Sequence, residues 1–222
     1  MSTNFSTSEE NYIKAIFHLQ KHEDRVSTNQ LSEELKTKAA SVTDMLKKLK
    51  RKKLLQYEPY QGVRLNAEGK RVALSIIRKH RLWEFFLVDK LKFGWDEVHE
   101  VAEELEHVSS NKLIELLDGF LNYPKFDPHG DPIPDSHGKM QVQQQLNLID
   151  VPLNQPVEIC AVSSRSAALL ELLSHKKILI GTRLEVKQKF SFDNSVEIRL
   201  KNRLPFTISQ QLAQALFVKP IS

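Results

Sequence analysis

The sequence predicts a mainly α-helical protein with a smaller β part, and three observations support this fold class. Apolar residues recur at helical intervals through most of the first 122 residues. Beyond Val151, short stretches that alternate between apolar and polar residues replace that pattern, which is typical of strands. The segment between them, Tyr123 to Lys139, holds four of the nine prolines together with Gly130 and Gly138. We therefore expect an extended, ordered loop or linker there.

Length and composition describe a globular protein without a membrane span. At 222 residues, 41% of them hydrophobic and 27% charged, the chain is long enough for one large domain or a few small ones. No apolar run approaches the roughly 20 residues that a spanning helix needs. The first residues lack the basic and apolar regions of a signal peptide, and the single cysteine, Cys160, excludes an internal disulfide framework. We expect a cytoplasmic protein with no membrane partner.

Three helices are predicted at the start of the chain. Thr7 and Glu10 have the spacing of a capping box, so the first helix is expected to begin near Thr7. A short second helix is expected from Thr28 to Leu35, and a brief connection, Lys36–Ala39, leads into the third. The apolar face of the third helix is formed by Val42, Met45, Leu46 and Leu49.

A hairpin is predicted directly after these helices. Residues 54–65 change to a period near two around a turn at Pro59–Gly62, which predicts strand, turn and strand. Three helices followed by a small hairpin are the outline of a winged helix-turn-helix, which we expect over residues 1–66. The third helix of such a unit lies in the DNA major groove, and the hairpin lies on the flanking backbone.

Positive charge is concentrated around the predicted third helix. The formal net charge is only +4, but eight basic residues and one acid, Asp44, lie between Lys36 and Lys53. Such a block suits a polyanion, and the alternative is a solvated helix face. Candidates for base or phosphate contacts are Lys38, Ser41, Thr43 and Asp44, with a role for Ser41 as an N-cap only as the alternative. Candidates for phosphate contacts alone are Lys47, Lys48, Arg51, Tyr60 and Arg64.

Residues 67–145 are predicted to form a helical middle domain. A long helix is expected from about Ala67 to Lys90, and a break at Gly94–Asp96 then caps a helix from Glu97 to about Val108. A further helix is expected to end at Asn122. We expect dimer contacts from apolar positions on these helices, since one amphipathic face can pack on the core while a second meets a partner.

Residues 152–222 are predicted to form a small β-barrel domain. The expected strands are Pro156–Val162, Arg183–Lys187 and Ser195–Leu200, with one short helix near Ala167–Leu173. Turns are supplied by Gly181 and by Asp193–Asn194. A domain of about 70 residues is of common size.

A cluster of His and Glu residues extends from His80 to His107. In the predicted helix around Val98, four of them lie beside an apolar stripe at i, i+4, i+7 and i+8: His99, Glu103, Glu106 and His107. The preceding helix offers His80 and Glu84 at i, i+4. Imidazoles and carboxylates at this spacing can converge on one cation, and the alternative is a solvated helix with incidental histidines. No ligand role is expected for His18, His22, His129, His137 and His175.

Five stretches of the sequence carry a family resemblance. They are Arg78–Glu84, Val98–His107, Asn11–Ile16, Ala40–Asp44 and Pro128–Pro134. The chain thereby resembles the diphtheria-toxin-repressor family of iron- or manganese-dependent repressors, which includes the manganese transport regulators. The resemblance covers roughly the first 145 residues. The remainder is similar, more loosely, to the SH3-like (FeoA-like) domain that longer members carry.

The resemblance implies two metal sites. The primary site matches Glu103, Glu106 and His107, with a ligand from the first helix at Asn11. The second site matches His80, Glu84 and His99. In the family, a Cys at the position of Glu103 marks iron-type repressors. Glu103 with its hard oxygens therefore favours Mn²⁺, with Fe²⁺ as the alternative.

Three departures from the family pattern affect these sites. Asn11 stands where the family usually has Asp or Met, so it offers a neutral carbonyl oxygen at best. Lys14 stands where the manganese subgroup has an acidic ligand, and we expect it to be a solvated surface lysine. Ligands donated by the SH3-like domain would fall near Cys160 and Ser163, and neither is a convincing match.

The function expected from the resemblance is metal-dependent repression of transcription. We expect a homodimer that binds a palindromic, double-stranded operator in response to Mn²⁺ or Fe²⁺ and controls genes of metal uptake and homeostasis. No enzymatic activity is expected. One alternative is a winged-helix regulator with only a structural metal site. Two others are a metal-dependent hydrolase, for which no HExxH-type signature is present, and a metal chaperone.

Overall fold

The computed structural model describes residues 5–21, 23–108, 110–163 and 166–221. It divides into two compact units, each described here by itself. The first comprises Met1–Trp83, Ala102–Tyr123 and Ile133–Met140, and the second comprises Glu84–Val101, Pro124–Pro132 and Gln141–Ser222. The predicted helical middle domain, residues 67–145, thus contributes to both units. The division into three domains at residues 1–66, 67–145 and 152–222 remains a prediction.

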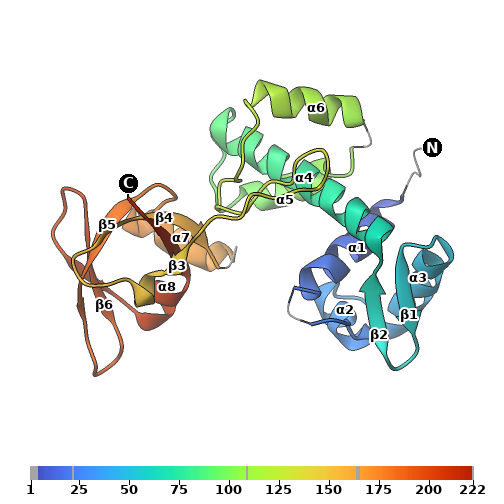
Figure 1. The fold of residues 1–222 in the computed structure, drawn as a ribbon, viewed down its shortest axis with the longest axis horizontal. Helices are drawn as coiled ribbons and strands as arrows, with labels where there is room; N and C mark the ends of the chain where they lie inside the picture. The colour runs from blue at the N-terminus through green and yellow to red at the C-terminus, as the bar shows by residue number, and fades with distance from the viewer. Residues whose placement is uncertain (1–4, 22, 109, 164–165, 222) are drawn as a thin grey trace. The chain divides into compact units, whose positions relative to one another are not determined.

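The first unit contains the predicted winged helix-turn-helix. Figure 1 shows three helices followed by a two-stranded hairpin next to α3. The elements are α1 (Thr7–Leu19), α2 (Thr28–Glu34), α3 (Ala39–Arg51), β1 (Leu55–Glu58) and β2 (Gly62–Leu65). The strands are antiparallel with Leu55 opposite Leu65, and both of these side chains are buried. The three helices pack around a core formed by Ile13, Ile16, Leu31, Leu46 and Leu49.

Helix α1 begins at Thr7 as predicted, but its capping box lies one residue earlier than predicted. Ser6 is the N-cap: its hydroxyl accepts from the Glu9 amide, and the Glu9 carboxylate accepts from the Ser6 amide. The prediction that Thr7 and Glu10 form the box was wrong because Ser6 and Thr7 each stand three residues before a glutamate, so either register satisfies the motif. The alternative role of Ser41 as an N-cap is excluded, since Lys38 holds that position in α3 without a side-chain hydrogen bond.

Three further helices follow the hairpin. They are α4 (Ala67–Asp89), α5 (Val98–Leu105) and α6 (Asn111–Phe120). Helix α5 is shorter than predicted because residues 95–97 form a turn before it and residues 106–107 form a turn after it. In the first turn the Gly94 amide donates to the Glu97 carboxylate at 2.9 Å. Glu106 and His107 lie in the turn after α5, and the Glu106 amide still donates to the Ala102 carbonyl. These two side chains therefore leave the helix at its C-terminal end.

The second unit contains the C-terminal SH3-like sheet. Its strands are β3 (Leu146–Asn147), β4 (Pro156–Val162), β5 (Arg183–Lys189), β6 (Val196–Leu200), β7 (Phe206–Ile208) and β8 (Leu216–Pro220). All pairs are antiparallel in the order β3-β8-β4-β5-β6-β7. The predicted SH3-like domain is confirmed, but within the described residues its strand order is open and does not close into a barrel. Its two end strands have two and three residues, too few to close the sheet.

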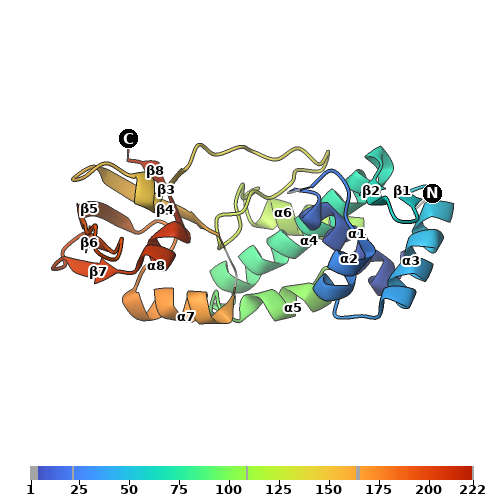
Figure 2. The same cartoon turned by 90° about the horizontal axis from the view of Figure 1, so that it is seen from below.

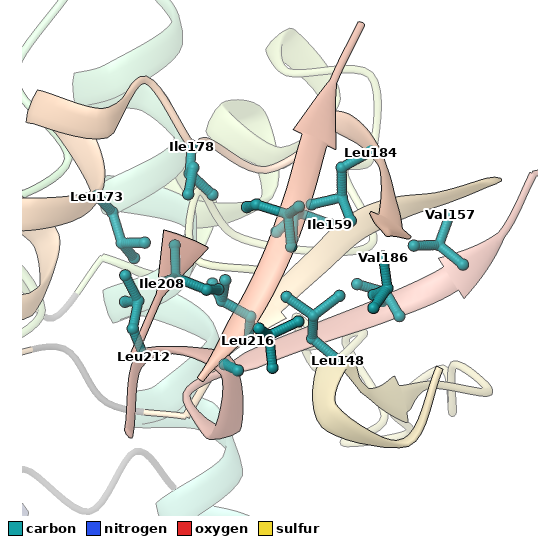
Figure 3. Close-up of a cluster of buried hydrophobic side chains, with 14 of the residues drawn as sticks. Leu148, Val157, Ile159, Leu173, Ile178, Leu184, Val186, Ile208, Leu212 and Leu216 are labelled. Carbon is teal, nitrogen blue, oxygen red and sulfur yellow. The ribbon is translucent and has the colours of Figure 1, made fainter. Parts of the chain in front are cut away.

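Helices and strands of this unit share one hydrophobic core. The helical elements are α7 (Ala167–Lys176), the short α8 (Gln210–Gln214), which leads from β7 into β8 (Figure 2), and the 3₁₀ turn η1 (Leu148–Asp150). Figure 3 shows side chains of Ile159, Leu173 and Leu216, from a strand, a helix and a second strand, gathered in this core. Trp95 is also part of the same buried cluster.

Gly130 fixes the proline-rich segment against β4 in the second unit. Its φ is +88°, and a Cβ there would lie 1.9 Å from the Cys160 carbonyl oxygen and 2.7 Å from the Ala161 Cα. The His129 carbonyl also accepts from the Val162 amide at 3.2 Å. Only glycine allows this approach, because both the backbone conformation and the space exclude a side chain.

Gly130→Ala is expected to lower the free energy of unfolding by about 2 kcal/mol or more relative to Gly181→Ala. Gly181 is the matched control because it has nearly the same φ, +86°, with no atom within 4 Å of its added Cβ. The difference between the two variants in urea unfolding isolates the steric contact with β4. Equal effects of the two substitutions would contradict the contact.

Candidate metal centre and DNA-binding surface

The first unit brings four of the predicted ligands together. Glu106, fully buried, lies between two imidazoles: its Oε2 is 2.7 Å from His80 Nδ1, and its Oε1 is 3.7 Å from His107 Nε2. The Oε1 atom of Glu103 is 4.0 Å from His80 Nδ1. His80, which the resemblance assigned to the second site, thus contacts two residues of the primary site. The carboxylates and imidazoles converge without an intervening hydrophobic side chain in these contacts.

Lys14 lies inside this cluster. Its Nζ is 2.6 Å from Glu103 Oε1 and 2.7 Å from Glu106 Oε1, and only 14% of its side chain is exposed. The prediction of a solvated surface lysine was wrong. Two carboxylates brought this close need a compensating cation, and the chain supplies one from α1.

Glu106 is held in its ionised form by these neighbours. Burial alone would raise the pKa of this carboxyl, but the hydrogen bond from His80 and the charge of Lys14 outweigh burial. The pKa of Glu106 therefore lies below its ordinary value. An ionised, buried carboxylate beside imidazoles is the kind of group that binds a divalent cation.

Glu10 orients His107. The Nδ1 atom of His107 lies 2.6 Å from Glu10 Oε2, so Nδ1 donates to this carboxylate and Nε2 faces Glu106. Carboxylate–imidazole pairs of this kind fix the tautomer of metal-binding histidines. The sequence reasoning missed Glu10. Its signal was its position next to Asn11 and one helical turn before Lys14.

Asn11 has the property expected of a ligand on α1. Its Oδ1 atom is buried and accepts no hydrogen bond from any described residue. Its helical neighbours Glu10 and Lys14 contact His107 and Glu106, respectively. A buried amide oxygen without a donor is costly unless a cation takes the place of the donor. The donor set Asn11, Glu103, Glu106 and His107 therefore fits a hard divalent cation, provided that the Lys14 ammonium moves aside.

The second unit brings together Glu84 and His99, and adds two residues. His99 Nδ1 is 3.1 Å from Glu84 Oε1. One donor atom from each of Glu84, Asp127 and His129 lies within 4.8 Å of the other two, and these residues are 0%, 4% and 1% exposed, respectively. His129 thus lies beside two carboxylates, which the sequence did not lead us to expect. Spacing along the sequence cannot show that His129 lies near Glu84, because this contact depends on the path of the proline-rich segment.

Among the described residues, three other histidines set aside from the sequence, His18, His137 and His175, do not belong to these clusters. His137 and His175 are exposed. His18 forms an edge contact with Phe17. His22 lies outside the described residues.

The candidate DNA contacts lie on α3 and on the hairpin, which is labelled β1 and β2 in Figure 1. Exposed positions are Lys38, Ser41, Asp44, Lys47, Lys48, Arg51, Tyr60 and Arg64. Thr43 is partly buried, and its hydroxyl donates to the Ala39 carbonyl. Tyr60 sits at the hairpin turn with a φ of +66° and a fully exposed side chain. Asp44 pairs with Lys47 and Arg64 with Asp24, both at the surface.

Glu9 joins α1 to the basic helix α3. Its Oε1 atom is 2.6 Å from Lys52 Nζ and 3.3 Å from Lys48 Nζ, and its side chain is 2% exposed. Burial raises the pKa of Glu9, but the hydrogen bonds from Lys52 and from the Ser6 amide outweigh burial and lower it to about 2. Lys48, a predicted phosphate contact, is thus also a partner of Glu9.

Glu9→Gln is expected to lower the free energy of unfolding by about 1–3 kcal/mol at neutral pH. The folded pKa, about 2, is below the ordinary 4.5, so the carboxylate stabilises the fold above pH 4.5 and this contribution is lost as the pH falls towards 2. Urea unfolding of the parent and variant between pH 7 and pH 3 measures this. The exposed Glu33→Gln is the control. A difference that does not shrink with acid would contradict an ionic origin.

These features define a class of protein: a winged helix-turn-helix protein with buried carboxylate–imidazole clusters. Three family models match along the chain: the N-terminal DNA binding domain of iron dependent repressors at residues 4–63, their metal binding and dimerisation domain at 66–135, and the FeoA domain at 146–220. The chain belongs to the diphtheria-toxin-repressor family of metal-dependent, DNA-binding transcriptional repressors.

Individual relatives agree with this assignment. The iron-dependent repressor IdeR of Mycobacterium leprae is 32% identical over 56% of this chain and 54% of its own length. An uncharacterized HTH-type transcriptional regulator of Methanocaldococcus jannaschii is 36% identical over 52% of this chain and 94% of its own. A manganese-dependent transcriptional repressor, solved in complex with manganese, is 30% identical with a TM-score of 0.82, covering 96% of this chain and 100% of that chain.

The extent of these matches and the hydropathy of the helices add two facts. The match spans about half the length of IdeR. Among the helices of the described residues, none is both long and apolar enough to cross a membrane.

Proposed function

We propose that this protein represses transcription in response to Mn²⁺, with Fe²⁺ as the alternative effector, and controls genes of metal uptake and homeostasis. The observation that carries the proposal is the convergence of Glu103 and Glu106 with His107, oriented by Glu10. Carboxylate oxygens favour Mn²⁺ over softer ions. When bound, the ion would supply positive charge between α1 and the end of α5. Asn11, Glu103, Glu106 and His107 would hold it.

Helix α1 is the element that can pass a change at the cluster to the DNA-binding surface. Glu10 and Lys14 contact the cluster, and Glu9 contacts Lys48 and Lys52 of α3. Because these residues share one rigid helix, a shift of α1 that accompanies displacement of Lys14 would also move α3. The effector acts only if the two positions of α1 bind it with different affinity.

The proposed partners are double-stranded operator DNA and a second copy of the chain. A homodimer presents two copies of α3, which favours a palindromic operator with half-sites one helical turn apart or a multiple of it. The exposed apolar residues on and after α6 support a dimer contact there: Leu113, Leu116, Phe120 and Tyr123. This segment lies in the region matched by the metal binding and dimerisation model.

Operator binding across metals tests the proposal. A duplex selected from a random library in the presence of Mn²⁺ is titrated by fluorescence anisotropy with Mn²⁺, Fe²⁺, Zn²⁺ or no metal, at fixed salt. We expect binding that Mn²⁺ strengthens at least about 10-fold, and Glu103→Cys is expected to shift the preference towards softer ions. Equal affinity without metal would instead favour a regulator with a structural metal site. An unchanged preference in Glu103→Cys would reject the argument for manganese.

A further inference from the structure

We propose that the outer face of the C-terminal sheet binds the phosphate backbone of double-stranded DNA, in addition to α3 and the hairpin. Residues 146–220 hold ten Lys and Arg and six Asp and Glu, a surplus of four positive charges. This surplus equals the formal net charge of the whole chain, +4, so the charges of the other residues cancel. A surface with the excess positive charge attracts a polyanion. The inference goes beyond the proposed function, because it involves neither the metal cluster nor the helix-turn-helix.

The charged residues of this face come from four neighbouring strands, β8, β4, β5 and β6. Apolar residues of these strands, such as Ile159, Val186 and Ile198, belong to the buried core. Because side chains alternate along a strand, the residues between them lie on the opposite face of the sheet. We call this the cationic face, and its charged residues are Glu158, Arg183, Glu185, Lys187, Arg199 and Lys219.

Glu158 lies between two cations of the cationic face. Its Oε1 is 3.0 Å from Lys219 Nζ, and its Oε2 is 3.4 Å from Arg183 Nε. Both partners stand opposite Glu158 in the strand register, so the pairing of the strands sets this arrangement. The side chains of Lys219 and Arg183 are 41% and 55% exposed, whereas that of Glu158 is 20% exposed. The two cations therefore reach further into solvent than the carboxylate.

The same arrangement repeats around Glu185. Its Oε2 is 2.9 Å from a guanidinium nitrogen of Arg199, which stands opposite it in the register, and it also accepts from Lys187 Nζ. The hydrogen bond from Lys187 holds the pKa of Glu185 below its ordinary value, so this carboxylate is ionised at neutral pH. The side chain of Arg199 is 47% exposed and that of Glu185 only 27%. Each carboxylate thus neutralises one of its two cations, and a net positive charge remains in the more exposed layer.

This layer fits a DNA backbone better than a membrane surface. A guanidinium has five N–H donors, so a bond to one carboxylate leaves donors for a phosphate. The carboxylates also hold the Arg side chains in place, which reduces the entropy lost when a phosphate binds. Surfaces that bind membranes combine cations with exposed apolar residues. In β4, β5, β6 and β8, which the structure describes completely, no large hydrophobic side chain is exposed.

The salt dependence of DNA binding by the full chain tests the cationic face. A duplex selected from a random library in the presence of Mn²⁺ is titrated by fluorescence anisotropy at a series of salt concentrations. For Arg183→Gln/Arg199→Gln, we expect the plot of log affinity against log salt to become less steep by about 2 per chain, and the affinity at low salt to fall about 10-fold or more. Lys125→Gln/Lys177→Gln removes the same charge from exposed positions outside the face and is expected to keep the parent slope. An unchanged slope in the Arg variant would overturn the proposal.

Two further measurements separate this outcome from a change in fold and from a different partner. Arg183→Lys/Arg199→Lys keeps both charges, so we expect it to retain the parent slope, and a loss as large as in the Gln variant would overturn an ionic origin. Vesicles of phosphatidylglycerol probe a membrane. If the parent binds them, the Gln variant does not, and the DNA slope is unchanged, the face belongs to a membrane surface and the proposal fails. Metal-independent operator binding would reject the proposed function alone, because the slope depends on no particular metal.

Discussion

Glu106→Gln is expected to abolish metal-responsive operator binding and to weaken Mn²⁺ binding by about 100-fold or more. Glu106 is fully buried: its Oε2 contacts His80, and its Oε1 contacts Lys14 and faces His107. Glutamine keeps the shape of the side chain but removes the charge that an ion needs. It also leaves Lys14 with one carboxylate instead of two, so we expect the free energy of unfolding to fall by about 3 kcal/mol.

Calorimetric titration of Mn²⁺ and thermal unfolding measure the two effects of Glu106→Gln. Glu104→Gln is the matched control, because Glu104 lies on α5 two residues before Glu106 but is exposed. The control is expected to keep both metal affinity and stability within error of wild type. A Glu106→Gln variant that binds Mn²⁺ like wild type would exclude Glu106 as a ligand.

Lys14→Met is expected to strengthen Mn²⁺ binding by about 10-fold or more and to destabilise the metal-free protein by about 1–3 kcal/mol. The ammonium lies within 2.7 Å of both Glu103 and Glu106. An ion that uses these oxygens has to displace it, which weakens the apparent affinity. Without the lysine, the buried Glu106 and the partly exposed Glu103 repel each other until an ion arrives, so the thermal stabilisation by Mn²⁺ should become larger.

Lys14→Met is expected to raise Mn²⁺ affinity and to lower the stability of the metal-free protein. These opposite effects distinguish competition with the ion from other roles of the lysine. If Lys14 only packed at the surface, its substitution would change neither Mn²⁺ affinity nor stability. If it supported the fold without facing the ion, the substitution would lower both. Lys112→Met, at an exposed position of α6, is the matched control. Weaker Mn²⁺ binding by Lys14→Met would contradict competition between the ammonium and the ion. Thermal unfolding with and without Mn²⁺ measures the change in stability, and calorimetric titration measures the change in Mn²⁺ affinity.

Prediction from the sequence succeeded where the signal is local. The winged helix-turn-helix and α4 were predicted closely because their patterns are local. Apolar residues recur every three to four positions in the helices and every two positions in the strands. Short elements carried too little pattern. The strands β3, β7 and β8 and the helix α8 were not predicted, since two to five residues do not show a period. The start of α1 at Thr7 was predicted, but its capping box was placed one residue too late because neighbouring residues satisfy the same motif.

The candidate ligands were predicted from their spacing and from the family resemblance, but their surroundings were not. Lys14 meets Glu103 across 89 positions, and Glu10 meets His107 across 97. No periodicity connects residues so far apart. The position of His129 next to Glu84 likewise depends on the path of the proline-rich segment. Gly130 permits this path because it has no side chain.

The sequence by itself therefore determined the order of elements, the basic helix and the residue types that can bind a metal, because these follow from local spacing and side-chain chemistry. Only the tertiary structure decided which of those residues meet. It brought Lys14 between two carboxylates, turned His107 with Glu10 and added Asp127 and His129 to Glu84. The physical reason is that burial and neighbouring charges, which set the protonation and cation affinity of a carboxylate, arise from contacts between distant parts of the chain.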